Sequence, residues 1–269
     1  MEPTLGFIKE LALQAGQILR NYVDKDLEIK HKSRTDLVTI ADHASEKFLI
    51  DSIKKAFPKH TINAEESGEW EGAADHQWFI DPLDGTLNYA HGVPIYSVSI
   101  GYAYQGEMTL GVIYDPSLDE IFCAERGKGV TLNGTPIHVA DHQDLIDCML
   151  FTGFPHDQWG TPDDNIDNFI RFCQVSQTVR RLGSAALAIA YIAAGRLDGI
   201  WEIEIHQWDI AAGALMVEEA GGIVTDINGG SDYLSKPVSF LAANPIIHSA
   251  MLDVLKEVRK KREIRSLKC

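Results

Sequence analysis

The pattern of apolar residues changes near residue 148, and this change limits the folds that the chain can adopt. Before it, three runs rich in β-forming residues, 96–104, 108–114 and 120–124, are separated by turn residues. Asn133-Gly134 then lies between two further short runs, which is a strong β-hairpin signal. This part of the chain predicts a mainly antiparallel sheet.

After residue 148, short strand-like segments alternate with helical ones. Met149-Leu150-Phe151 and Gly199-Ile200-Trp201 have the composition of strands, whereas residues 184–194 and 210–220 have that of helices. Such alternation is typical of a layered α/β structure. We therefore expect an N-terminal α+β half over residues 1–147 and a C-terminal α/β half over residues 148–269, packed as one continuous body.

Two helices are expected at the start of the chain. Apolar residues from Ile8 to Tyr22 recur at the 3.6-residue period, and a second helix is predicted over about residues 42–57, where Pro58 ends it.

The formal net charge of −15 argues against nucleic acid as a partner, because phosphate backbones require clustered Lys and Arg. The basic cluster at residues 259–262 suits the exposed end of a helix. No apolar run approaches the roughly 20 residues needed to cross a bilayer, and the N-terminus lacks the pattern of a signal peptide. We therefore expect a cytoplasmic protein with no membrane partner.

Cysteine and histidine give little sign of a metal centre. The four cysteines are widely spaced and include no C-x-x-C pair, so neither a compact zinc knot nor a disulfide framework is predicted. His138 and His142 have the spacing of helical neighbours, but Pro136 and the preceding hairpin argue against a helix there. A zinc centre is therefore not expected from the spacing.

Acidic residues give a stronger signal. The apolar run Trp78-Phe79-Ile80 leads into Asp81-Pro82-Leu83-Asp84-Gly85-Thr86, a turn that can direct two carboxylates toward one point. Gly85 permits close approach of the backbone, and a helical turn beginning there would offer free N–H groups to an anion. Asp-x-x-Asp alone is a weak pattern, because Asp and Gly are also common in surface turns.

Three further acidic positions support this interpretation: Glu65-Glu66, Asp42 and Asp209. Each also has an ordinary explanation, since Glu65-Glu66 suits a solvated loop and both aspartates suit helix caps. Together, however, they supply the oxygen ligands that magnesium requires, with room for phosphate. Such acids could share a pocket with a phosphate group only if cations offset their repulsion.

Four blocks of the sequence resemble the inositol monophosphatase family, within the wider fructose-bisphosphatase-like superfamily. The blocks are Glu65-Glu66-Ser67, residues 78–88, Gly183-Ser184-Ala185-Ala186 and residues 208–213, and they occur in the family's order. The resemblance implies a layered sandwich of alternating α-β-α-β-α layers, a homodimer, and a magnesium-dependent phosphatase that hydrolyses inositol monophosphate.

The resemblance also implies ligands for two or three magnesium ions. Glu65, Asp81 and the Leu83 carbonyl would hold the first ion, whereas Asp81, Asp84 and Asp209 would hold the second. Glu65 would also face a third, weaker ion.

The same resemblance implies roles in catalysis and substrate binding. Asp42 and Thr86 would orient the attacking water, together with the metal ligand Glu65, and Glu66 would support the ligands from outside. Substrate would be bound by Asp84, Gly85, Thr86, Ala185 and Glu202. Gly85 and Thr86 would donate backbone N–H groups to the phosphate, whereas Ala185 and Glu202 would contact inositol hydroxyls.

Two positions depart from the family pattern. Leu87 replaces a frequent second threonine, and the spacing does not decide whether Lys30 or Lys32 is the lysine near the metal.

Several alternatives share the same site. The enzyme could hydrolyse fructose 1,6-bisphosphate, alone or alongside the inositol ester, or else histidinol phosphate or 3′-phosphoadenosine 5′-phosphate. A non-catalytic relative that regulates by binding macromolecules is a different class, which the complete set of acidic ligands argues against.

Overall fold

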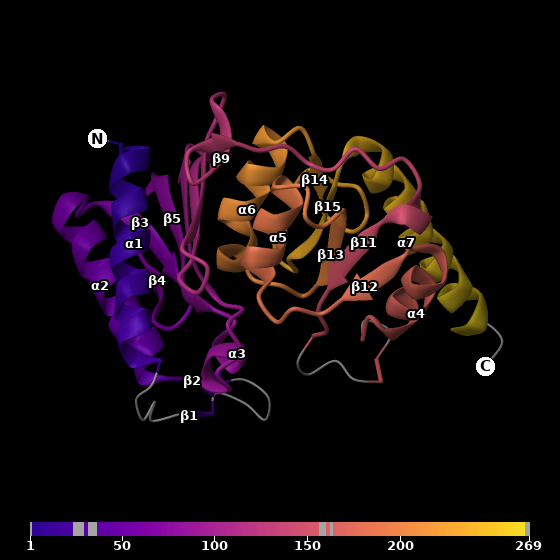
Figure 1. The fold of residues 1–269 in the computed structure, drawn as a ribbon, viewed down its shortest axis with the longest axis horizontal. Coiled ribbons are helices and arrows are strands. Elements are labelled where there is room, and N and C mark those ends of the chain that lie inside the picture. Colours follow the sequence, from indigo (N-terminus) through magenta and orange to yellow (C-terminus); the bar gives the residue numbers. More distant parts are fainter. Residues whose placement is uncertain (1, 24–29, 32–36, 156–159, 162–163, 267–269) are drawn as a thin grey trace.

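The structure, a computed structural model, describes residues 2–23, 30–31, 37–155, 160–161 and 164–266. Five layers follow one another across the molecule in Figure 1: helices α1 and α2, a large sheet, helices α5 and α6, a smaller sheet, and helices α4 and α7. The layered α-β-α-β-α sandwich predicted from the sequence is confirmed by this arrangement.

The large sheet has eight strands in the order β10-β9-β8-β7-β6-β5-β3-β4. All its neighbouring pairs are antiparallel except β3 and β5. Its strands are β3 (His60–Ala64), β4 (Gly68–Trp70), β5 (Ala73–Asp84), β6 (Ser97–Tyr104), β7 (Glu107–Asp115), β8 (Glu120–Glu125), β9 (Gly129–Leu132) and β10 (Thr135–Pro136). The predicted β-rich runs are thus strands β6, β7 and β8, and Asn133-Gly134 forms the predicted hairpin between β9 and β10.

The smaller sheet has the order β12-β11-β13-β15-β14. Strand β11 is parallel to both β12 and β13, whereas β15 is antiparallel to both β13 and β14. Its strands are β11 (Met149–Thr152), β12 (Thr178–Arg180), β13 (Gly199–Ile203), β14 (Ile223–Thr225) and β15 (Ser239–Ala243). A separate short pair joins β1 (Lys30–His31) to β2 (Leu37–Val38).

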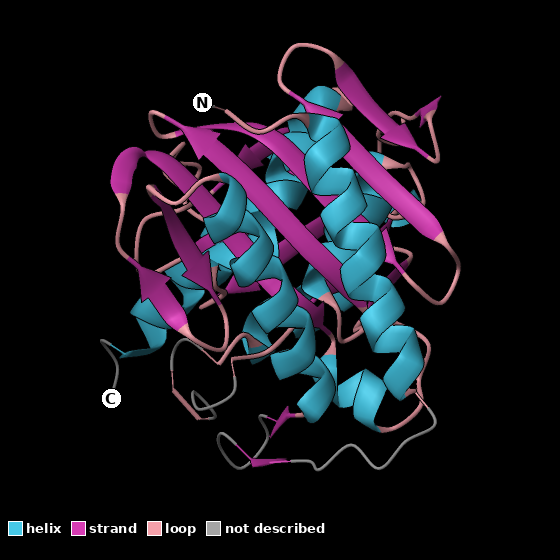
Figure 2. Cartoon of the chain, turned by 90° about the vertical axis from the view of Figure 1, so that its left-hand side faces the viewer, coloured by secondary structure: helices cyan, strands magenta, loops and turns pink. Residues whose placement is uncertain are grey.

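Helices cover both faces of the large sheet. Helices α1 (Leu5–Tyr22) and α2 (Ile40–Ala56) lie across its outer face (Figure 2), where Ile8, Leu49 and Ile53 share a core with Trp78 and Tyr102. Helices α5 (Ala185–Ala193) and α6 (Gln207–Glu219) fill the space between the sheets. The remaining elements are α3 (Thr86–Ala90), η1 (Leu145–Asp147), α4 (Ile166–Val175) and α7 (Pro245–Ser266).

The middle layer is built from small apolar residues. Helix α5 reads Ala-Ala-Leu-Ala-Ile-Ala-Tyr-Ile-Ala, and most of its residues are fully buried. A helix that is apolar on all sides suits a position between two sheets. Gly111 on β7 lets α6 approach the large sheet, since a Cβ there would lie 2.8 Å from the carbonyl oxygen of Ala212.

This close approach makes Gly111→Ala destabilising. We expect the free energy of unfolding to fall by about 1–3 kcal/mol, because the methyl group would push α6 away from β7. The matched control is Gly6→Ala on α1, where a Cβ meets only the hydroxyl of Thr4 at 3.9 Å. That change should stabilise the protein by up to about 1 kcal/mol. Denaturant unfolding of the two variants checks the prediction, which fails if both change stability in the same direction.

Candidate active site

A cleft of about 450 Å³ opens where the two sheets and the middle helices meet. The β5–α3 turn contributes Asp81, Leu83, Asp84, Gly85 and Thr86, and Glu65 lies beside it. The opposite wall comes from the smaller sheet and the starts of α5 and α6. Its polar residues are Arg181, Ser184, Glu202, Glu204, His206 and Asp209.

The β5–α3 turn presents two carboxylates because the strand loses its regular register there. Pairing of β5 with β6 shifts between Asp81 and Asp84, and the Leu83 N–H donates to Asp81 Oδ1 at 3.0 Å. Gly85 then adopts a φ of 93°. A Cβ at this position would lie 2.9 Å from the Ile95 carbonyl oxygen, so the turn requires glycine.

Asp81, Asp84 and Asp209 converge in this cleft. Carboxylate oxygens of the three lie within 4.8 Å of one another. Asp209 is the third residue of α6, and its Oδ2 accepts a hydrogen bond from the His206 N–H at 3.0 Å. It therefore stabilises the start of its helix without being the N-cap residue itself. Glu65 is held beside β5 by its own N–H, which donates to the Ile80 carbonyl at 3.2 Å.

The three aspartates are strained electrostatically. Burial raises the pKa of Asp81 well above its usual range, and the nearby charges of Glu65, Asp84 and Asp209 raise it further. Burial likewise raises the pKa of Asp209, with added repulsion from Asp84 and Glu65. An all-oxygen set of mutually repelling carboxylates fits a hard divalent cation such as magnesium, which would offset their charge.

Asp84 also joins the two halves of the molecule. Its Oδ2 accepts hydrogen bonds from the Ser184 hydroxyl and from the Ala186 N–H, the latter at 2.9 Å. Its Oδ1 accepts from the Ala185 N–H at 3.1 Å. The carboxylate thus occupies the N-terminal end of α5, where free N–H groups and the helix dipole favour a negative charge. Burial raises the pKa of Asp84, whereas these hydrogen bonds oppose the increase.

Asp42 and Thr86 are in contact, as the family resemblance implies. Thr86 Oγ1 lies 3.0 Å from Asp42 Oδ1 and 3.0 Å from the Leu83 carbonyl oxygen. The other oxygen of Asp42 accepts from the N–H and the hydroxyl of Thr39, at 2.8 and 2.6 Å. Thr39 is therefore the N-cap of α2, and Asp42 completes its capping box. Burial raises the pKa of the fully buried Asp42.

Glu202 lies at the far wall, on β13. Burial raises its pKa to about 8, and the backbone N–H of Gly153 and the charge of Arg181 oppose the increase. A Cβ on Gly153 would lie 2.9 Å from both carboxyl oxygens of Glu202, so the loop after β11 approaches this carboxyl closely only because residue 153 is glycine.

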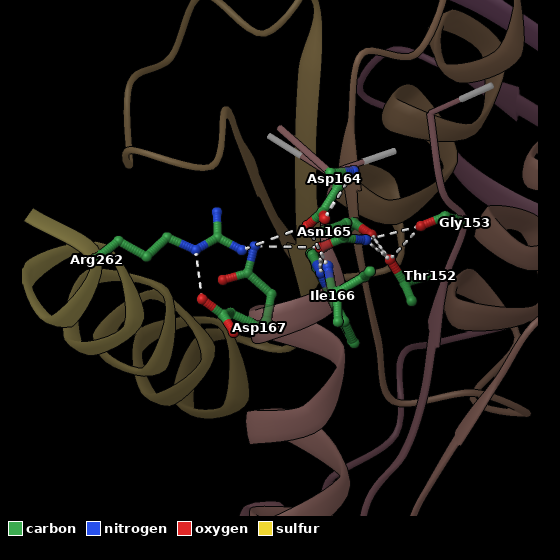
Figure 3. A network of polar contacts seen from close by, with 10 residues as sticks. Thr152, Gly153, Asp164, Asn165, Ile166, Asp167 and Arg262 are labelled. Atoms are coloured by element: carbon green, nitrogen blue, oxygen red, sulfur yellow. Dashed lines mark hydrogen bonds and ion pairs between the residues drawn. The ribbon is translucent and has the colours of Figure 1, made fainter. Parts of the chain in front are cut away.

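A buried amide holds this loop in place (Figure 3). The side-chain NH₂ of Asn165 donates to the Thr152 hydroxyl and to the Gly153 carbonyl, at 2.9 and 2.7 Å. Its Oδ1 accepts from the Trp201 indole N–H at 2.8 Å. Nearby, Arg262 of α7 donates to Asp167 at the start of α4, at 3.0 Å. Sequence reasoning missed Asn165, because a single asparagine carries no pattern.

The remaining positions discussed in the sequence analysis lie partly in the cleft and partly outside it. Ala185 lines the cleft, and Leu87 lines it with about half of its surface exposed. The Glu66 N–H donates to the Glu46 carboxylate of α2 at 2.8 Å, and Glu66 is not among the described residues that line the cleft. The side chain of Lys30 and all of Lys32 lie outside the described residues. Arg181, Ser184, Glu204 and His206 are among the polar cleft residues to which the sequence assigned no role, although Ser184 lies within one of the family-like blocks.

Comparisons with known proteins show the family of this chain. A family model described as the Inositol monophosphatase family matches residues 1–261. The chain is 43% identical to Nus factor SuhB of Escherichia coli (strain K12), over 96% of this chain and 97% of that protein. It is 40% identical to an inositol-1-monophosphatase of Mesorhizobium japonicum, over 94% and 96%.

A solved structure, the extragenic suppressor protein suhB from Bartonella henselae, superposes with a TM-score of 0.87. It is 40% identical and covers 93% of this chain and 96% of that one. The chain belongs to the inositol monophosphatase family.

The raised pKa of Glu202 predicts how stability depends on pH. The carboxyl is neutral in the folded protein up to about pH 8 but ionises near pH 4.5 in the unfolded chain. The contribution of Glu202 to the free energy of unfolding is therefore lost as the pH rises from about 4.5 to about 8. Glu202→Gln cannot ionise. We expect the metal-free variant to gain a few kcal/mol relative to wild type between pH 5 and pH 9. Unfolding of both proteins across this range tests the prediction, and parallel stability profiles would contradict it.

Proposed function

We propose that this member of the inositol monophosphatase family is a magnesium-dependent phosphomonoesterase that hydrolyses inositol monophosphate to inositol and phosphate. The observation that carries the proposal is the convergence of Asp81, Asp84 and Asp209 beside the contact between Asp42 and Thr86. The cleft therefore combines a set of cation ligands with a hydroxyl–carboxylate pair that can move a proton.

The proposed ligands follow the oxygen donors that converge in the cleft. Glu65, Asp81 and the Leu83 carbonyl would hold one magnesium ion, and Asp81, Asp84 and Asp209 a second, with Glu65 facing a third. Bound ions would lower the pKa of a water and stabilise the charge of the leaving alkoxide. The carboxylates themselves, already positioned by backbone N–H groups, would need little rearrangement on binding.

Asp42 and Thr86 would activate the water. The Thr86 hydroxyl can donate its proton to Asp42 Oδ1 while accepting one from a water in the cleft. Thr39 fixes Asp42 from the opposite side, so the acceptor oxygen keeps its orientation. Burial raises the pKa of Asp42, which makes it a stronger proton acceptor than an exposed aspartate. The N–H groups of Gly85 and Thr86 would donate to the phosphoryl oxygens.

The leaving group would lie against the opposite wall. Glu202, with its pKa raised to about 8, is neutral near pH 7 and can both donate to and accept from a sugar hydroxyl. Ala185, at the start of α5, would contact a neighbouring hydroxyl. Fructose 1,6-bisphosphate is the main alternative substrate, because Arg181 lines the same wall and could meet a second phosphate.

A regulatory role is the alternative from another class, and the name Nus factor carried by some relatives favours it. The intact set of acidic ligands supports catalysis nonetheless, since a purely binding protein has no need for buried, mutually repelling carboxylates.

The proposal has three further parts: the protein is a homodimer, it is located in the cytoplasm, and its chain divides into two halves near residue 148. Among the described residues, no helix is both long and apolar enough to cross a membrane.

The substrate is tested by phosphate release in the presence of magnesium, with inositol 1-phosphate and fructose 1,6-bisphosphate offered separately. We expect a higher kcat/KM for the inositol ester, because the neutral carboxyl of Glu202 can form hydrogen bonds with the hydroxyl groups of a polyol. Preference for the fructose ester would move the enzyme to the bisphosphatase alternative, and magnesium-dependent release from neither would refute the proposal.

The metal ligands are tested by Asp209→Asn. We expect kcat to fall by roughly a hundredfold or more, because an electrostatic group is removed from the reacting centre. The metal-free variant should melt no lower than wild type, since one of three repelling carboxylates is neutralised. Asp253→Asn on α7, with 76% of its side chain exposed, is the matched control and should keep full activity. A rate near that of wild type in Asp209→Asn would contradict the assignment.

A further inference from the structure

A second group of metal-ligating side chains lies away from the cleft. Ligand atoms of His142, Cys148 and Asp198 are all within 4.8 Å of one another. Cys148 directly precedes β11, and Asp198 directly precedes β13. Because β11 and β13 are parallel neighbours, both residues lie at the N-terminal ends of their strands. Glu202, at the other end of β13, is about 13 Å away along the strand.

His142 comes from a different segment, the connection that runs from β10 to η1. Its Nδ1 lies 2.6 Å from Asp198 Oδ1, and 48% of its side chain is exposed. Asn244 fixes this connection, because its side-chain NH₂ donates to the carbonyls of Ala140 and His142 at 3.0 and 2.9 Å. The half-exposed imidazole of His142 therefore lies at the surface beside two buried side chains, those of Cys148 and Asp198.

The two buried groups are oriented by hydrogen bonds. Asp198 Oδ2 accepts from the Met149 N–H at 2.6 Å, which leaves Oδ1 directed toward His142. Cys148 is a free thiol whose S–H donates to the Asp144 carbonyl at 3.3 Å, a hydrogen bond that the thiol gives up when it ionises to bind a metal. The backbone contact on Asp198 is of the kind that holds metal ligands in position in proteins with known sites.

We propose that His142, Cys148 and Asp198 form a binding site for zinc or a similar borderline-soft divalent cation. Sulfur, nitrogen and oxygen ligands of these types are those that Zn²⁺ takes, and water would complete a tetrahedral set at the exposed side. Magnesium is disfavoured because it takes oxygen ligands. A thiolate and a carboxylate together balance the charge of the ion, so binding releases the thiol proton.

The acidic surroundings favour a cation here. Asp141, Asp144 and Asp147 lie in the same segment as His142 and Cys148 and add negative charge to it. A bound ion would join the connection between β10 and η1, which carries His142, to the N-terminal ends of β11 and β13. Metal binding at this site would therefore stabilise the fold, and the ion would take no part in hydrolysis.

Cobalt(II) is the probe, because a thiolate ligand gives it a charge-transfer absorption band in the near ultraviolet. Excess magnesium would occupy the cleft, where no cysteine is found among the described lining residues. We expect wild type to bind one cobalt per chain at this site with that band, zinc to displace it, and zinc to raise the melting temperature. The absence of a thiolate band in wild type would overturn the proposal.

Variants assign the band to these residues. Cys148→Ser should abolish it, whereas Cys173→Ser, at an exposed thiol on α4, should leave it unchanged. His142→Ala alters a surface side chain and should weaken cobalt affinity at least tenfold. Should Cys148→Ser fail to fold, His142→Ala decides the question, since an unchanged dissociation constant would refute the site. A band lost in Cys173→Ser but kept in Cys148→Ser would also refute it.

Discussion

Repulsion among buried carboxylates is the constraint on which the rest of this structure depends. Carboxylate oxygens of Asp81, Asp84 and Asp209 lie within 4.8 Å of one another. Burial raises the pKa of all three carboxyls, and the charges of neighbouring carboxylates raise those of Asp81 and Asp209 further. The protein offsets part of this cost with backbone N–H groups. Leu83 donates to Asp81, His206 to Asp209, and the first turn of α5 to Asp84. Divalent cations would offset the remainder, so the repulsion that opposes folding also favours metal binding.

The middle helices determine where these carboxylates meet. Helix α5 is short, almost wholly apolar and buried between the sheets, so its N-terminal N–H groups have little access to solvent except at the cleft. Asp84 satisfies them from the large sheet. Helix α6 approaches the large sheet through Gly101 and Gly111, which brings Asp209 at its start to the ends of β5 and β6. Packing of small residues in the middle layer therefore sets the geometry of the acidic cluster.

Much of this could be predicted from the sequence, because local patterns report local structure. The β-rich runs, the Asn133-Gly134 hairpin and the first two helices follow from periodicity and turn chemistry. Asp81 and Asp84 were identified from the strand that ends in them. Contacts such as Thr39 with Asp42 follow capping rules, although the sequence alone suggested Asp42 as the cap. The roles assigned to Glu65, Asp42 and Glu202 rested on resemblance to a family.

What the sequence by itself determined is which residue types stand at which turns and strand ends: an acidic turn after an apolar strand, an acid in the first turn of a helix, and a glycine directly after Asp84. Tertiary structure alone decided which of these meet. The hydrogen bonds between Asp84 and α5 join residues about a hundred positions apart, and His142 meets Cys148 and Asp198 rather than His138. The physical reason is that local spacing limits only neighbours within one element. Contacts between elements depend on how closely side chains let helices and sheets pack.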